Sequence, residues 1–211
     1  MTTQFVSSGV VSSGVIVTGG NTLEILSGGT ANATSVTSSG TVQVDVGGLA
    51  SATILSGSLA TEIVSGTDIS GTVSSGGTLD VFGSASSATV FSGGVENVSS
   101  GGSVANQVIS GGQEFVSLDG QDSATQVGGG GTLTVENFGF AQSTVVNSGG
   151  TEVLVAGGLG VGALASGGSI IVSSGGQLDL IAGDAPGARA ASRSCRAVSS
   201  MRADTRSAAI R

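Results

Sequence analysis

The sequence predicts an all-β fold, a parallel β-solenoid with a period of about 18 to 19 residues per coil, and three observations point to it. Ser-Gly and Gly-Gly steps recur along most of the 211 residues, at intervals that alternate between long and short. Each long and short interval together spans roughly 17 to 19 residues, in an unbroken succession from Gly29 to Gly176. Val, Ile and Leu stand at regular places between the steps. Such a period is typical of units that bury their apolar face only by stacking on their neighbours.

The composition favours an ordered repeat over a flexible linker. The chain has 39 Gly and 6 Phe but no Trp, Tyr or His, so a core of large aromatic side chains is excluded. A stacked core of Val, Ile and Leu is what remains, and the mean hydropathy of the chain is positive. Flexible linkers rich in Gly and Ser lack β-branched residues at regular intervals. We therefore expect the repeat region to fold.

The chain divides into two parts. Residues 1–182 form the predicted solenoid domain, with an atypical first coil at residues 1–20, where the intervals fit the period poorly. Residues 183–211 are a non-repeat tail that contains the only Pro, the only Cys and all six Arg. Because the composition changes so abruptly, we expect this C-terminal tail to be disordered or to arise from an out-of-frame reading of the gene.

The short intervals read as strands, because their apolar residues alternate with polar ones, as Leu79 and Val81 do. Each of the first eight short intervals also carries an acidic residue at a variable distance from the preceding glycine. These residues are Glu24, Asp45, Glu62, Asp80, Glu96, Glu114, Glu136 and Glu152. We interpret them as a solvated face that discourages aggregation between sheet edges, rather than as a metal-binding ladder.

The long intervals carry Thr at a repeated place, five residues after the glycine step, in six of eight cases. Gln107 and Ala163 are the two exceptions. Equivalent residues of a parallel solenoid stack at about 4.8 Å, so these threonines are expected to form a structural column whose hydroxyls bond along the ladder. The column consists of Thr34, Thr53, Thr72, Thr89, Thr125 and Thr144.

The glycines of the steps are expected to serve the turns between sheets. Glycine reaches positive φ without the steric cost that other residues incur, and the chain must turn every eight to ten residues. In the long intervals a pair of apolar residues, such as Val90 and Phe91, follows the repeated Thr. The alternation alone leaves open which residue of each pair faces inward.

The residue inventory excludes most kinds of chemistry. Without His, neither a Ser-His catalytic arrangement nor a His-ligated metal site can form. Residues 1–188 hold thirteen carboxylates and no basic side chain, so nucleic-acid binding is not expected. No apolar stretch is long enough for a membrane span, and no signal peptide is visible. We expect no enzyme activity, no cofactor and no metal.

The sequences of two long intervals resemble those of a known family. These intervals are SATVFSGG at residues 87–94 and STVVNSGG at residues 143–150. They alternate with short intervals such as GTLDVFG at residues 77–83. This alternation resembles the AIDA-type repeat region of self-associating autotransporter adhesin passenger domains in Gram-negative bacteria. The resemblance covers roughly residues 5–182.

The resemblance implies a right-handed parallel β-helix that is displayed on the cell surface or secreted. It implies adhesion or cell-to-cell aggregation, through self-association or contact with host or other cells. In the full-length family a C-terminal translocator barrel follows the passenger, and none is expected within this chain. The resemblance also implies sugars on Ser or Thr of the repeats, for which the candidates are Ser56, Ser92, Ser110 and Ser148.

Two alternative functions stay open on the sequence. One is a secreted solenoid that binds ice or polysaccharide through arrays of Thr and Ser. The other is a passive structural stalk that holds a further domain away from the cell.

Overall fold

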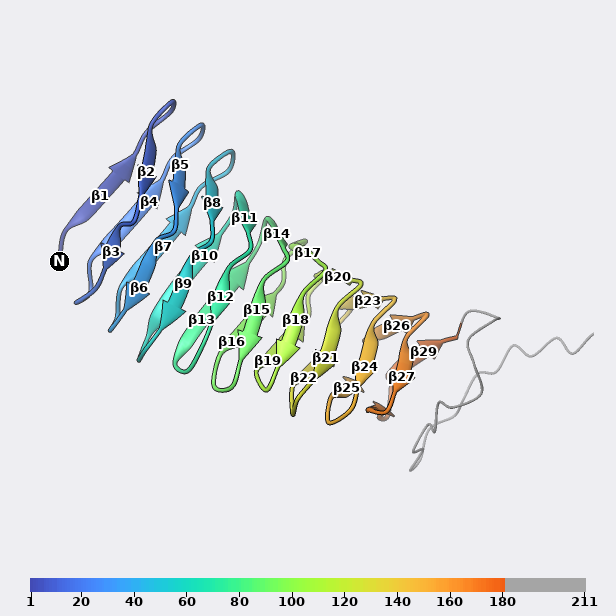
Figure 1. The fold of residues 1–211 in the computed structure, drawn as a ribbon. Coiled ribbons are helices and arrows are strands. Elements are labelled where there is room, and N and C mark those ends of the chain that lie inside the picture. Colours follow the sequence, from blue (N-terminus) through green and yellow to red (C-terminus); the bar gives the residue numbers. More distant parts are fainter. Residues whose placement is uncertain (181–211) are drawn as a thin grey trace, which may run out of the picture.

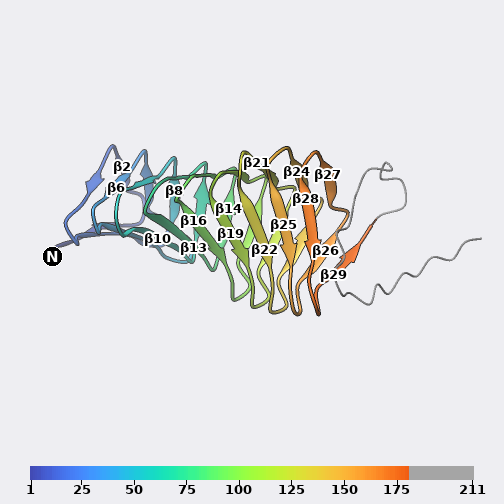
Figure 2. The same ribbon diagram turned by 90° about the horizontal axis from the view of Figure 1, so that it is seen from below.

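The computed structural model describes residues 1–180, and these form twenty-nine short strands and no helix. The strands wind into a long stack of coils with β1 at one end and β29 at the other (Figures 1 and 2). All strand pairs within the three sheets are parallel. The predicted fold class, an all-β parallel solenoid, is confirmed. The predicted tail, residues 183–211, lies outside the described residues.

Each coil contributes one strand to each of three sheets, which we call sheets 1, 2 and 3. Sheet 1 contains β1 (Thr3–Val6), β4 (Thr22–Ile25), β7 (Thr41–Val44), β10 (Ala60–Val64), β13 (Gly77–Val81), β16 (Val95–Val98), β19 (Gln113–Val116), β22 (Thr132–Val135), β25 (Thr151–Leu154) and β28 (Ser169–Val172). Sheet 2 contains β2 (Val11–Ser13), β5 (Thr30–Asn32), β8 (Leu49–Ser51), β11 (Thr67–Ile69), β14 (Ser84–Ser86), β17 (Ser103–Ala105), β20 (Gln121–Ser123), β23 (Phe140–Gln142), β26 (Leu159–Val161) and β29 (Gln177–Asp179). Sheet 3 contains β3 (Ile16–Val17), β6 (Ser35–Thr37), β9 (Ile54–Ser56), β12 (Thr72–Val73), β15 (Thr89–Phe91), β18 (Val108–Ser110), β21 (Gln126–Gly128), β24 (Val145–Asn147) and β27 (Leu164–Ser166).

The register between coils follows the sequence period. Thr3 pairs with Thr22, and Thr22 pairs with Thr41, so each of these coils has a length of about 19 residues. Residues 1–20, whose intervals fit the period poorly, still form a coil of three strands that pairs in register with the next coil.

The interior is narrow and is filled by aliphatic side chains. Sheet 1 turns two side chains inward in most coils, as Leu79 and Val81 of β13 do, and sheet 3 turns one inward, as Val90 of β15 does. Sheet 2 supplies smaller side chains, among them Ala31, Ala50, Ala85 and Ala141. None of the six Phe is buried, because sheets that face each other so closely leave no room for aromatic rings.

The glycine steps serve two purposes. In most Gly-Gly steps only the first glycine has the positive φ expected from the sequence, although Gly19 and Gly20 both have it. Gly157 has a φ of 81°, whereas Gly158 does not lie in this region. A Cβ atom on Gly158 would instead lie 2.0 Å from the carbonyl oxygen of Val135 in the preceding coil. The first place tolerates other residues, including Phe138 at a φ of 68°. The second place holds glycine in most coils because two backbones pass each other closely there, and Ala60, the register partner of Gly77, is an exception.

Candidate functional site

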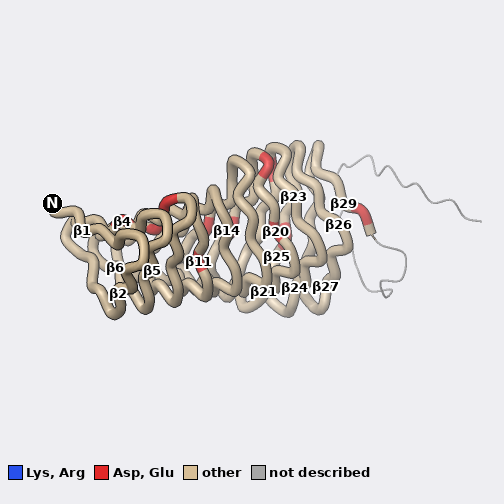
Figure 3. Tube along the Cα trace, turned by 90° about the horizontal axis from the view of Figure 1, so that it is seen from above, with Lys and Arg blue, Asp and Glu red and all other residues tan. Residues whose placement is uncertain are grey.

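Six carboxylic acid side chains lie inside the solenoid. They are Glu62, Asp68, Glu96, Glu114, Asp122 and Glu152, and each is at most 1% exposed. This finding corrects the interpretation of the short-interval acids as one solvated face, because four of the eight point into the core. Figure 3 shows Asp and Glu along the chain and no Lys or Arg in its described part.

The distance from the corner glycine decides which acids are inside. Glu96 and Glu114 stand two residues after Gly94 and Gly112. In neighbouring coils Leu79 pairs with Glu96, and Leu133 pairs with Glu114, so carboxyl groups and leucines share one inward column. The column runs Leu23, Val42, Glu62, Leu79, Glu96, Glu114, Leu133, Glu152 and Ile170.

Acids at other distances lie on the outside. Asp80 stands three residues after Gly77 and is partly exposed, and its Oδ1 accepts a hydrogen bond of 2.7 Å from Asn97 Nδ2. Glu136 is five residues after Gly131 and is partly exposed as well. A distance of two residues from a corner glycine therefore marks five of the six interior acids in the sequence, and Glu62 follows Ala60, which occupies the glycine position of its coil.

The two interior aspartates lie in sheet 2 and obey the same rule. Asp68 and Asp122 stand two residues after Gly66 and Gly120. They occupy an inward column that otherwise holds small residues, such as Ala85, the register partner of Asp68. Sequence reasoning missed both residues because it searched the short intervals alone for a pattern of acids.

Hydrogen bonds from polar side chains reach only some of the six interior carboxyl groups. Thr53 Oγ1 donates a hydrogen bond of 3.3 Å to Glu62 Oε1, and Gln107 Nε2 donates one of 3.1 Å to Glu96 Oε1. The Thr125 hydroxyl donates to Asp122 Oδ1. The second carboxyl oxygens of Glu62, Glu96 and Asp122 have no hydrogen-bond partner, and neither oxygen of Glu114 has one.

Burial raises the pKa of every one of these six carboxyl groups, and neighbouring carboxyl groups raise several of them further. The pKa of Glu96 rises to about 8, by burial and then by the charges of Asp122 and Asp68. Burial raises the pKa of Asp68, Asp122 and Glu152 to about 7. The pKa values of Glu62 and Glu114 are raised well above the usual range for the same first reason. The interior carboxyl groups therefore keep their protons at a pH where Asp and Glu of an unfolded chain have lost them.

The structure places the six threonines of the predicted column at two adjacent positions of the coil. Thr34, Thr53, Thr125 and Thr144 are buried at the entrance to sheet 3. Thr72 and Thr89 lie one position later, where they pair with Ile54 and Val108 and are partly exposed. These two threonines are shifted because the corner glycines of their coils are Gly66 and Gly83. The spacing of five residues in the sequence was counted from the residue that follows each of these glycines.

The candidate serines for glycosylation gather at the corner where sheet 3 leads into sheet 1. Ser92 and Ser148 lie in the turns and are exposed, while Ser56 and Ser110 end strands β9 and β18 and are partly exposed. All four side chains are thus accessible from one side of the solenoid.

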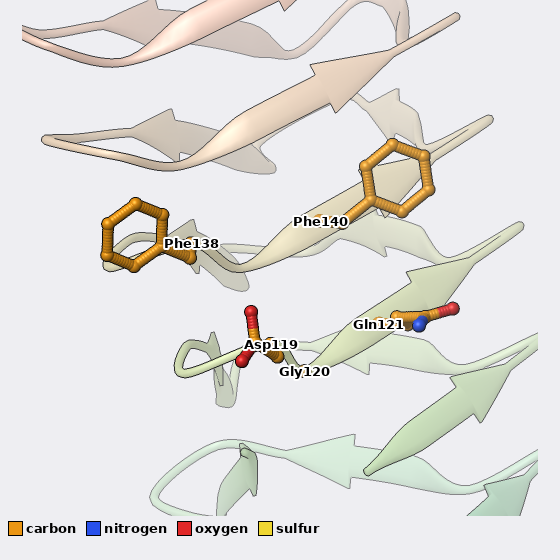
Figure 4. Close-up of a pocket in the computed structure, with 5 residues that line it drawn as sticks. All are labelled: Asp119, Gly120, Gln121, Phe138 and Phe140. Atoms are coloured by element: carbon orange, nitrogen blue, oxygen red, sulfur yellow. The ribbon is translucent and has the colours of Figure 1, made fainter. Parts of the chain in front are cut away.

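A shallow hollow of about 390 Å³ lies at the corner between sheets 1 and 2 (Figure 4). Asp119 and Gln121 line it from one coil, and Phe138 and Phe140 line it from the next, with Gly120 at its floor. No group of three or more His, Cys, Asp or Glu in residues 1–180 is arranged to hold a metal ion. The hollow is open, and it offers contact area rather than the enclosed arrangement that a catalytic site needs.

No helix that could cross a membrane occurs within residues 1–180. No protein-family model matches the sequence, and no curated protein matches it significantly. Among solved structures, the chain is similar to the crystal structure of a TibC-catalysed hyper-glycosylated fragment of TibA. The two chains share 27% sequence identity with a TM-score of 0.63, over 84% of this chain and 77% of the TibA fragment. The repeat region thus has the fold of an AIDA-type autotransporter adhesin passenger, which confirms the resemblance inferred from the repeats.

Proposed function

We propose that this chain is a non-catalytic passenger module of a surface adhesin, which promotes attachment of cells or their aggregation with one another. The similarity to the TibA fragment is the observation that carries the proposal. The surface agrees with it, because the outward positions repeat Ser and Thr from coil to coil, together with exposed apolar side chains such as Phe91 and Val108. Weak contacts that recur in coil after coil can add up to firm attachment through avidity.

Display of residues 1–182 on a bacterial surface is expected to speed settling of the culture and to raise attachment to a solid support. The measurement compares turbidity loss and retained cells with those of cells that display the same anchor without the repeats. A mixed culture in which only one strain displays the repeats separates self-association from attachment to any cell. Unchanged settling and attachment would contradict adhesion and favour a passive stalk.

We further propose that the repeats accept sugars at the corner between sheets 3 and 1. The TibA fragment is described as hyper-glycosylated by TibC, and Ser92 and Ser148 are exposed here in equivalent turns. A hydroxyl in such a turn can be approached by an enzyme without opening the coil.

Coexpression with TibC is expected to increase the mass of the chain, with sugar found at Ser92 and Ser148 by peptide mass spectrometry. The double substitution Ser92→Ala and Ser148→Ala is expected to remove these two modified peptides. Thr125 and Thr144, which are buried, serve as internal controls and should stay unmodified. An unchanged mass, or sugar confined to other residues, would overturn the assignment of these two serines.

A further inference from the structure

We propose that the solenoid is a pH-sensitive structure whose middle coils, from β10 to β27, are held together by protonated interior carboxyl groups and loosen when these groups ionise. The proposal depends on the geometry of the interior and is independent of the adhesive function. Six buried carboxyl groups occupy this stretch, and no Lys or Arg occurs among the described residues to neutralise them.

The interior acids are close enough to act as one set. Glu96 and Glu114 are direct register partners on β16 and β19, and adjacent strands lie about 4.8 Å apart. Glu152 pairs with Leu133, which in turn pairs with Glu114, so the third glutamate is two coils further along. Two negative charges at such distances in a dry interior repel each other strongly.

Glu114 shows why ionisation is unfavourable here. It faces Glu96 from β16, Asp122 from β20 in its own coil and Leu133 from β22, and the charge of Glu152 acts on it from β25. No basic group of residues 1–180 offsets these charges. Neither carboxyl oxygen accepts a hydrogen bond, so an ionised Glu114 has no compensation at all.

The other interior acids face similar surroundings, with a single hydroxyl or amide in place of a cation. Glu62 faces Asp68 and the Thr53 hydroxyl, and Glu96 faces Asp122, Asp68 and the Gln107 amide. Asp122 accepts a hydrogen bond from the Thr125 hydroxyl. Asp68 lies beside the backbone N–H groups of Ile69 and Gly71, and Glu152 faces Asp122 and Thr144, but no carboxyl oxygen of either residue has a hydrogen-bond partner. Each group is thus better accommodated as the neutral acid.

The direction of the pH effect follows from these raised pKa values. The unfolded chain loses the same protons near pH 4, at the usual pKa of Asp and Glu. Between that pH and about 8, where Glu96 titrates in the folded chain, the folded chain holds more protons than the unfolded chain. Stability is therefore greatest at and below about pH 4, and it falls as the pH rises through the range in which the interior acids of the folded chain ionise.

The test is urea unfolding of the full chain at pH 5, 6, 7 and 8 and constant ionic strength, followed by circular dichroism. Unfolding should release at least two protons, so we expect the unfolding constant to rise at least a hundredfold per pH unit between pH 5 and 7. Unfolding in weak buffer with a pH indicator counts the released protons directly. An unfolding constant that stays the same from pH 5 to 8 would overturn the proposal.

Matched variants assign the effect to the interior. The double substitution Glu96→Gln and Glu114→Gln is expected to lower the number of released protons and flatten the pH dependence. Glu114→Leu, which repeats the side chain found at Leu79 and Leu133, provides a second variant that does not need a buried amide. The control is Asp80→Asn with Glu136→Gln, a partly exposed acid on β13 of the same sheet and one directly after β22, and it should leave the pH dependence unchanged. An equal loss of slope in the control and in the interior variants would refute the assignment.

Discussion

Replacing Gly158 by Ala is expected to destabilise the solenoid by about 3 kcal/mol, because the new methyl group would collide with the neighbouring coil. Its Cβ would lie 2.0 Å from the Val135 carbonyl oxygen and 2.9 Å from the backbone nitrogen of Glu136. Both contacts are with backbone, which cannot move aside without breaking the coil-to-coil hydrogen bonds around it. Urea unfolding of the variant at pH 5, where the interior acids are protonated, measures the loss.

Gly128→Ala is the matched control for this substitution. Gly128 ends β21 on the outside of sheet 3, has no positive φ, and its added Cβ would meet the Asn147 Cβ at an ordinary 3.4 Å. This variant is expected to change the free energy of unfolding by less than about 0.5 kcal/mol. Similar losses in the two variants would mean that the close approach of coils at Gly158 does not cause the destabilisation.

Leu133→Glu is expected to destabilise the solenoid by about 4 kcal/mol at pH 8 and by about 2 kcal/mol at pH 4. Leu133 pairs with Glu114 on one side and with Glu152 on the other, and Glu114 pairs in turn with Glu96, so the change creates four adjacent carboxyl groups in the inward column. At pH 8 the new carboxyl group must either ionise beside the other carboxyl groups or stay protonated, and both lower the free energy of unfolding. At pH 4 only the burial of a neutral acid remains.

Leu133→Gln separates charge from polarity in this test. The amide is as long as the carboxyl group and does not titrate, so its destabilising effect should be the same at pH 4 and pH 8. If the glutamate and glutamine variants lost equal stability at both pH values, electrostatic repulsion in the column would be disproved.

The sequence alone determined the fold, because the period and the alternation are local properties of the chain. A regular spacing between equivalent glycines, with apolar residues at every second place, permits stacked coils with strands between the corners. The exclusion of His-based chemistry is likewise a matter of composition. The resemblance to adhesin repeats could be read from segments such as residues 87–94 and 143–150 for the same reason.

The tertiary structure decided which side of each strand faces the core. The alternation of Leu79 and Val81 placed Asp80 on the outside, but in Gln113–Val116 it could not show whether Glu114 or Phe115 faces the core. That choice is made at the corners, where a buried glycine such as Gly112 packs against the backbone of the preceding coil and thereby turns the second residue after it into the interior. The same geometry divided the threonines between two positions and brought Asp68 and Asp122, from a different sheet, beside the glutamates. A carboxyl group becomes a proton-binding interior group only when the neighbouring coils remove it from water, and the spacing of residues along one chain does not contain that information.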